Sequence, residues 1–254
     1  MNEDKRILEY WNEQALKYKE SVEATSPDFY AFNIERNVIL KFLRDGQKVL
    51  NVGCGNGIKD VEYCRQKRIQ LKGLDYSHEM ISVANNELKK ATGLFGELVF
   101  EYGDVLDLTE RDEYHIVITD RCLINLGTEQ NQRKAIDNIH RSLKLGGVFL
   151  MMECTKEGLI RINEVRKDFN LEEIKERWHN NYLSDSVIRF AKEKFSTMEV
   201  DNFNSTYFLI SRTINALVTK EGEPINYMSD INKFASMLPA VGDFAPLKLF
   251  VLTK

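Results

Sequence analysis

Three glycines at alternate positions follow a short apolar segment near residue 50. The segment Val49–Val52 runs directly into Gly53-Cys54-Gly55-Asn56-Gly57, and a helical pattern begins behind it. Glycines at this spacing allow a sharp strand-to-helix turn that brings the backbone close to a ligand. The start of the helix adds unpaired N–H groups and a partial positive charge. The pattern predicts a binding site for a small polar ligand at the carboxyl end of the strand.

Acidic residues follow the next two predicted strands. Asp75 ends the second strand, eighteen residues after Gly57, and an acid there suits a bidentate hydrogen bond to the two hydroxyls of a ribose. Asp104 follows the third strand, where a carboxylate can accept a hydrogen bond from the amine of adenine. Together they indicate adenosine, which both NAD and S-adenosylmethionine carry. The dinucleotide fingerprint needs a glycine where the sequence has Ile58, and this disfavours NAD.

Short apolar segments alternate with amphipathic segments of ten or more residues through the first 153 residues. Such alternation is typical of βαβ units, in which right-handed crossovers join parallel strands. It predicts a doubly wound α/β core, preceded by one helix from Glu3 to about Ser21 and another from Asp28 to about Leu43. The expected strands are 48–52, 70–75, 97–101, 115–119 and 147–153, and the expected helices between them are 58–67, 78–91 and 128–144.

The pattern changes beyond Glu153. Residues 156–195 are patterned as two or three helices, and 198–217 and 247–254 as strands. The segment between these two strands carries three of the four prolines and is too long for a hairpin turn. Long loops of this kind are usually functional, so we expect a lid there.

The composition bounds the class of protein. The chain has 254 residues, a net charge of −4 and 43% hydrophobic residues, which fits one globular α/β domain with an appended lobe. Its mild acidity offers no basic surface to a nucleic-acid backbone. A signal peptide and a run of about 18 apolar residues are both absent from the sequence. The four cysteines lie far apart without a C-x-x-C pair, so we expect reduced thiols in a cytoplasmic protein without a metal site.

Five sequence motifs, taken in order, resemble the class I S-adenosylmethionine-dependent methyltransferases. The likeness covers about residues 30–154, and the motifs stand in the family's order and spacing. It implies S-adenosylmethionine as the cofactor, S-adenosylhomocysteine as its product, and a seven-stranded sheet of order 3-2-1-4-5-7-6 whose last strand is antiparallel. The motifs are VLNVGCGNG (49–57), the acid of GLDYS (73–77), GDV (103–105), TDRCLINL (119–126) and RSLKLGGVFLMME (141–153).

The resemblance also implies which residues bind the cofactor. Gly53, Cys54 and Gly55 would lie beside its methionine part, and Asp75 would bind the ribose. In the family, an N-terminal helix commonly closes over the cofactor. The other implied positions are Tyr76 and Met80 near the adenine, Gly103, Asp104 and Val105 around its edge, Thr119 and Asp120 at the amino group, and Trp11 and Tyr18 in the covering helix.

Methyl transfer makes few chemical demands on the remaining residues. The sulfonium is a strong electrophile, so the reaction needs an in-line nucleophile at near-contact distance, and an oxygen nucleophile must also lose a proton. The ends of the fourth and fifth strands and the helical insert are expected to line the mouth of the pocket. The fork of Arg121 suits a carboxylate or phosphate of the acceptor. The candidates for catalytic groups are Asp120, Arg121, Glu153, His179 and Tyr182, and no metal ligand set is recognisable.

These observations predict transfer of a methyl group to a small polar metabolite. Oxygen is the expected acceptor atom, and a sugar or sugar nucleotide is the expected class of acceptor. The sequence TDRC after the fourth strand lacks the prolines that accompany transfer to exocyclic amines. The alternatives are an NAD-binding oxidoreductase and a nucleotide-binding module without catalysis.

The expected domain organisation follows from the same pattern. Residues 1–254 would form one domain, in which residues 1–44 cover the cofactor site. The inserts 155–197 and 218–246 would form an acceptor-binding lobe. Neither a nucleic acid nor a membrane is an expected partner, and the sequence leaves the oligomeric state open.

Overall fold

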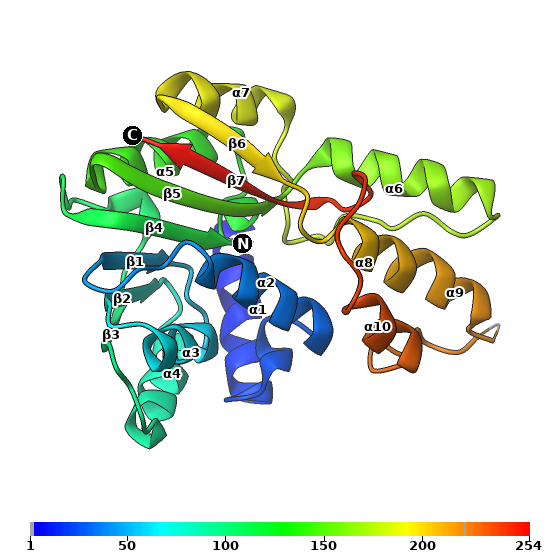
Figure 1. Ribbon diagram of the computed structural model, residues 1–254, viewed down its shortest axis with the longest axis horizontal. Coiled ribbons are helices and arrows are strands. Elements are labelled where there is room, and N and C mark those ends of the chain that lie inside the picture. Colours follow the sequence, from blue (N-terminus) through cyan, green and yellow to red (C-terminus); the bar gives the residue numbers. More distant parts are fainter. Residues whose placement is uncertain (1–2, 221) are drawn as a thin grey trace.

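A seven-stranded sheet forms the centre of the protein, which a computed structural model describes over residues 3–220 and 222–254 (Figure 1). The strands are β1 Lys48–Val52, β2 Gln70–Asp75, β3 Glu97–Tyr102, β4 Tyr114–Asp120, β5 Leu143–Cys154, β6 Thr197–Asp201 and β7 Leu247–Thr253. Their order is β3-β2-β1-β4-β5-β7-β6, and β7 runs antiparallel to both of its neighbours. The other neighbouring strands pair in parallel. The sheet confirms the doubly wound fold and the strand order that the resemblance implied.

The described residues form ten α-helices around this sheet. They are α1 Glu3–Tyr18, α2 Phe29–Leu40, α3 Ile58–Gln66, α4 His78–Lys90, α5 Glu129–Ser142, α6 Lys156–Asp168, α7 Asp185–Lys194, α8 Ser205–Leu209, α9 Asn215–Val218 and α10 Asp230–Ala235. A π-helical turn, Ile210–Ile214, joins α8 to α9, and short 3-10 turns lie at Val22–Ala24, Val105–Asp107 and Leu123–Asn125.

Each face of the sheet carries its own apolar core. Successive side chains of a strand point to opposite faces, so Val49 packs with α2, α3 and α4, whereas its neighbour Leu50 packs with α5 and α7. Both faces are covered, and the inner strands are therefore apolar on both sides. This explains why the sequence shows continuous apolar segments for β1, β4 and β5.

Local capping explains why several helices begin where the sequence predicts. Asp28 accepts a hydrogen bond from the N–H of Ala31, 3.1 Å away, at the start of α2. Ser77 accepts one from the N–H of Met80, also at 3.1 Å, at the start of α4. The first turns of these helices are thus fixed by residues that the sequence shows directly.

The prediction of a strand over 198–217 is wrong for most of that segment. The strand β6 has only five residues, and α8, the π-helical turn and α9 follow it. Tyr207, Ser211 and Asn215 are four residues apart and all buried, so the segment buries one helical face. Its β-branched and aromatic residues favour a strand, but the packing of its buried face against other elements stabilises a helix. The predicted long loop 218–246 likewise contains α10.

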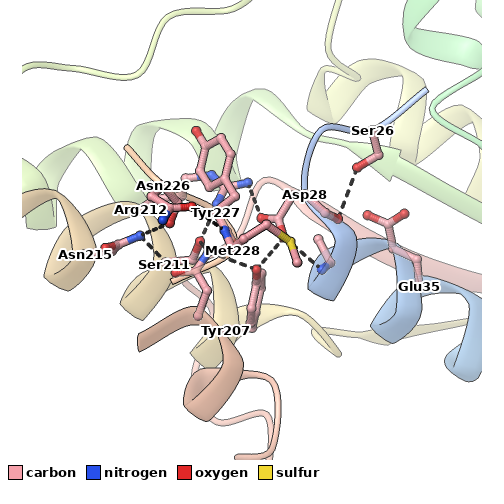
Figure 2. Close-up of polar contacts among 12 residues, drawn as sticks. Ser26, Asp28, Glu35, Tyr207, Ser211, Arg212, Asn215, Asn226, Tyr227 and Met228 are labelled. Atoms are coloured by element: carbon pink, nitrogen blue, oxygen red, sulfur yellow. Dashed lines mark hydrogen bonds and ion pairs between the residues drawn. The ribbon is translucent and has the colours of Figure 1, made fainter. Parts of the chain in front are cut away.

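The helices α6, α8, α9 and α10 form a lobe beside the sheet, on the right of Figure 1. The lobe meets α2 through an apolar contact in which Ala31 packs with Tyr207 and Ala235. Asp28, at the start of α2, is the polar centre of the same contact (Figure 2). Its Oδ1 accepts a hydrogen bond from the hydroxyl of Tyr207 at 2.5 Å, and its Oδ2 accepts one from Nη2 of Arg212 at 2.8 Å. A buried carboxylate with three donors therefore fixes α2 to the lobe.

Replacing Tyr207 with phenylalanine should lower the free energy of unfolding by about 1.5–3 kcal/mol, because a buried hydrogen bond to a charged group is lost. Urea unfolding measures this loss. Tyr30→Phe is the matched control, since it removes a hydroxyl from a partly buried tyrosine in the same contact. Equal stabilities of the two variants would contradict the anchoring role of Asp28.

Candidate functional site

A cavity of about 390 Å³ opens at the carboxyl ends of β1, β2, β3 and β4. Its walls come from α1, the glycine loop 53–57, the first turn of α3 and the segments that follow β2, β3 and β4. Every lining residue lies between Lys5 and Asn131, so the inserts 155–197 and 218–246 contribute no side chain to the walls. The volume is within the range of pockets that bind small molecules.

The glycine loop forms the floor of this cavity. Gly53 has φ +72°, and a Cβ atom at this position would lie 2.8 Å from Cβ of Cys122 in the segment after β4. Gly57 begins α3 with φ +74° and without a side-chain cap. The N–H groups of Gly53 and Cys54 donate to the carbonyl of Leu74, at 2.8 and 2.9 Å. Glycine is therefore required for the close approach of the loop to its neighbours.

Asp75 ends β2 beside the loop and is buried. Its two oxygens accept hydrogen bonds from the N–H groups of Gly55 and Ser77, each at 2.9 Å. Burial raises the pKa of Asp75 to about 6, although these bonds and one from the backbone of Tyr76 act to lower it. The ionised carboxylate keeps lone pairs that can accept hydrogen bonds from vicinal hydroxyls.

The residues predicted to surround an adenine come together in the cavity wall. Met80 lies at the start of α4, and Asp104 begins the 3-10 turn after β3, where its Oδ1 accepts a hydrogen bond from the N–H of Leu106 at 2.8 Å. A slot with apolar walls and a polar edge suits a flat heterocycle. The predicted residues that line it are Tyr76, Met80, Gly103, Asp104 and Val105.

The helix α1 forms part of the cavity wall. Its residues Lys5, Leu8 and Trp11 line the wall. The indole N–H of Trp11 donates to Oδ1 of Asn125, 3.2 Å away, and so ties α1 to the segment after β4. Tyr18 lies outside the cavity wall, where it packs against a small cluster that includes Met80.

Four charged side chains meet at one end of the cavity. Glu35 of α2 is fully buried, and its carboxylate receives a bidentate pair from Arg121, at 2.6 and 2.8 Å, and a bond from Lys59 at 2.7 Å. Lys59 also pairs with Oδ2 of Asp120. Burial alone would raise the pKa of Glu35, but the charges and hydrogen bonds of Arg121 and Lys59 outweigh it and lower the pKa to about 2. Glu35 is therefore ionised throughout the ordinary pH range.

Lys59, Asp120 and Arg121 line the cavity, whereas Glu35 lies behind them. Arg121 has φ +55°, which is uncommon for a residue other than glycine. The second oxygen of Asp120, Oδ1, lies 3.2 Å from Nη2 of Arg121 but accepts no hydrogen bond from the described residues. A buried oxygen of this kind is an acceptor for a donor that a ligand brings.

Glu153 has a structural role outside the cavity. It lies fully buried on β5, and its carboxylate accepts hydrogen bonds from the backbone N–H groups of Cys122, Leu123 and Ile124, at 3.1, 3.0 and 3.4 Å. Burial raises the pKa of Glu153 to about 7 against these bonds. Glu153 shapes the turn after β4 and does not reach the cavity, contrary to its prediction as a catalytic group.

His179 also lies outside the cavity wall. Its ring stacks on Tyr10 with centroids 4.3 Å apart, and it meets Trp11 and Trp178 edge-on at 5.6 and 5.4 Å. Burial lowers the pKa of His179 to about 4, so the ring is neutral near pH 7. It helps to hold α1 over the cavity.

The other predicted residues that lie outside the cavity wall are Tyr182, packed beside Cys154, and Thr119 on β4.

Sequence reasoning missed Glu35 and Lys59. Glu35 is a single acid on the mostly apolar helix α2, and Lys59 stands two residues after the last glycine of the loop. Both were visible as isolated charges in apolar or glycine-rich surroundings. Their contact joins residues 24 positions apart to a third segment after β4, and no local pattern encodes that contact.

No described helix is long and apolar enough to cross a bilayer. Within residues 3–220 and 222–254, no three His, Cys, Asp or Glu side chains are grouped as metal ligands.

The sequence of residues 43–204 matches the family described as methyltransferase domain. A curated relative, the ribosomal protein L11 methyltransferase of Dictyoglomus turgidum, is 30% identical over 142 residues, which cover 55% of this chain and 44% of that protein. The mRNA cap guanine-N(7) methyltransferase of Saccharomyces cerevisiae is 28% identical over 164 residues, which cover 59% and 38%. The matched part of this chain thus spans less than half the length of these relatives.

A solved structure has a similar fold. The N-methyltransferase NodS of Bradyrhizobium japonicum, in complex with S-adenosylhomocysteine, aligns with a TM-score of 0.56 and 12% identity over 96% of this chain and 97% of that chain. The sheet order, the glycine loop and the acid at the end of β2 define a class I S-adenosylmethionine-dependent methyltransferase domain. The chain belongs to the methyltransferase domain family, as its motifs predicted, and S-adenosylmethionine is the cofactor.

The residues of the cavity fit this cofactor. Gly53, Cys54 and Gly55 line the cavity without bulky side chains, and Asp75 beside them offers a carboxylate to vicinal hydroxyls. At the other end, Asp120 offers an unused acceptor beside two cations. A nucleoside that carries an amino-acid group matches this distribution of polar groups.

Replacing Asp60 with asparagine should raise stability at high pH relative to the wild type. Asp60 is fully buried beneath the loop, accepts a hydrogen bond from Nδ2 of Asn51 at 2.6 Å, and has a pKa that burial raises from 3.8 to about 8. The folded state binds the proton more tightly, so the stability from this group is fully present below pH 3.8 and is lost as pH rises to about 8. Urea unfolding of both proteins at pH 5 and pH 8.5 measures the effect. If the difference in stability between wild type and Asp60→Asn were the same at both pH values, the raised pKa of Asp60 would be contradicted.

Proposed function

We propose that this domain transfers the methyl group of S-adenosylmethionine to an oxygen atom of a small polar metabolite, such as a sugar or sugar nucleotide. The single observation that carries the proposal is the cavity, which joins a nucleoside-binding end to a charged end under the helix α1. We also propose that the reaction takes place in the cytoplasm and that the substrate is not a nucleic acid.

Each end of the cofactor has its own residues in this proposal. Asp75 accepts hydrogen bonds from the ribose hydroxyls, and Asp104 receives the adenine amine. The backbone of the glycine loop lies beside the methionine part. Oδ1 of Asp120 accepts a hydrogen bond from the amino group, because it is a buried acceptor without a donor among the described residues.

The chain's contribution to the reaction is chiefly positioning. When bound, the cofactor supplies an electrophilic methyl group. Trp11 and its bond to Asn125 hold α1 across the cavity, which excludes water and confines the acceptor beside the cofactor. Holding two reactants in attacking geometry contributes on the order of 7–11 kcal/mol to such reactions.

The size and lining of the cavity support a small acceptor. The cavity of about 390 Å³ is in the range of small-molecule pockets, and Lys5, Asn125 and Asn131 add polar groups to its wall. By their names, the curated relatives act on a ribosomal protein and on an mRNA cap. An acceptor screen with tritiated S-adenosylmethionine therefore includes sugars, sugar nucleotides, a cap analogue and a ribosomal protein fraction. Methylation of the last two alone would overturn the proposal of a small metabolite.

The affinity for S-adenosylhomocysteine should fall by up to about tenfold between pH 7 and pH 5. The ionised form of Asp75 accepts the ribose hydroxyls, and this form is lost as pH falls through about 6. Isothermal titration calorimetry with S-adenosylhomocysteine, and with NAD in parallel, measures the profile. The Asp75→Ala variant should bind S-adenosylhomocysteine more weakly than the wild type binds it at pH 7, and its affinity should not depend on pH in this range. Normal affinity in this variant, or binding of NAD alone, would overturn the assignment of Asp75.

Asp120→Asn should weaken binding of S-adenosylmethionine roughly tenfold, because an ionised acceptor facing an ammonium group is lost. The turnover number at saturating cofactor should change little, since the side chain does not act as a base in this proposal. Steady-state kinetics with an acceptor from the screen separates the two effects. A large loss of kcat at unchanged KM for the cofactor would instead make Asp120 the general base.

A further inference from the structure

The buried acid behind the charged end of the cavity has no direct access to a ligand. The side chain of Glu35 is 1% exposed, and both of its oxygens are already bonded to Lys59 and Arg121. The two cations, in contrast, are 13% and 25% exposed and line the cavity. Any effect of Glu35 on a ligand must therefore pass through Lys59 and Arg121.

We propose that Glu35 is a positioning residue that holds Lys59 and Arg121 where they bind the carboxylate of the cofactor's amino-acid end. The inference rests on the proposed function, because it takes this cavity as the cofactor site. It assigns the carboxylate to the two cations and leaves the amino group to Asp120. The acceptor need not carry an anion under this assignment.

The two cations keep donors for such a carboxylate. Lys59 has three N–H donors and two carboxylate partners, Glu35 and Asp120, so one donor is left. Arg121 has five N–H donors and uses two of them in its fork with Glu35. A ligand carboxylate can thus bind without displacing Glu35.

The position of Lys59 in the chain places it beside the methionine part. It lies in the first turn of α3, directly after the glycine loop. The start of a helix carries a partial positive charge and free N–H groups, and this favours an anionic group at the same place. The lysine charge and the helix start therefore act on one ligand group.

Arg121 depends on Glu35 for its orientation. Its backbone adopts φ +55° at the end of β4, which places its guanidinium against α2. The planar fork of an arginine is fixed by a bidentate carboxylate in a way that a single hydrogen bond does not reproduce. Without the charge of Glu35, the two neighbouring cations would also repel each other and compete for Asp120.

The test compares two ligands that differ at the amino-acid end. S-adenosylhomocysteine carries it, and 5′-methylthioadenosine has the same nucleoside and thioether without it. Isothermal titration calorimetry measures both affinities. Relative to the wild type, Glu35→Gln should bind S-adenosylhomocysteine roughly ten- to hundredfold more weakly and 5′-methylthioadenosine equally well. Lys59→Met should give the same pattern, which supports the inference even where a variant of buried Glu35 fails to fold.

Arg36→Gln is the matched control, since Arg36 is the next residue of α2 and bonds to its neighbour Asn37 on the exposed side. Its affinities for both ligands should equal those of the wild type. Thermal unfolding of every variant shows whether the fold is retained.

Several outcomes would overturn the inference. An equal loss for both ligands in folded Glu35→Gln would mean that Glu35 only supports α2. Unchanged affinity for both ligands in folded Glu35→Gln would mean that Glu35 does not position the cations, and unchanged affinity for both in Lys59→Met would mean that Lys59 does not bind the carboxylate. A raised KM for the acceptor alone would assign the cations to the acceptor. A wild type that binds neither ligand would refute the proposed function itself, which is a distinguishable result.

Discussion

The close approach of the glycine loop to the segment after β4 is the constraint on which the rest of the site depends. A single Cβ atom at Gly53 would overlap Cys122, so these two segments meet only because the loop has no side chain there. Glu153 fixes the other side of this contact by accepting the backbone N–H groups after β4. The floor of the cavity is therefore built from backbone, and the polar side chains around it are free to meet a ligand.

The lobe contacts α2, the helix that carries Glu35, and does not line the cavity. Asp28 fixes the start of α2 to Tyr207 and Arg212 of the lobe, and Glu35 lies two turns further along the same helix (Figure 2). The helix α2 thus carries both the residue that contacts the lobe and the residue that holds Lys59 and Arg121. The inserts 155–197 and 218–246 contribute no described residue to the cavity wall, and an acceptor-binding lobe there stays a prediction.

The parts of the protein that the sequence predicts are those encoded by local pattern. The strands β1 and β2, the glycine loop and Asp75 follow from spacing within about 25 residues, and their predicted bounds match the structure. The helical segment after β6 was missed because its β-branched residues fit a strand equally well, and its packing against α2 decided the outcome. Glu35 was missed for a similar reason, since its role arises from contacts with two distant segments.

The pKa of a buried carboxyl group is shifted in opposite directions at the two ends of the cavity. Burial acts on Asp75 and Glu35 alike, but neutral backbone N–H groups oppose it at Asp75, whereas the positive charges of Lys59 and Arg121 oppose it at Glu35. The pKa is consequently raised to about 6 in the first and lowered to about 2 in the second. Glu35 therefore stays ionised at mildly acidic pH, whereas Asp75 takes up a proton as the pH falls through about 6. Under the proposed function, mildly acidic pH would therefore weaken the contact of Asp75 with the ribose before it affects Glu35.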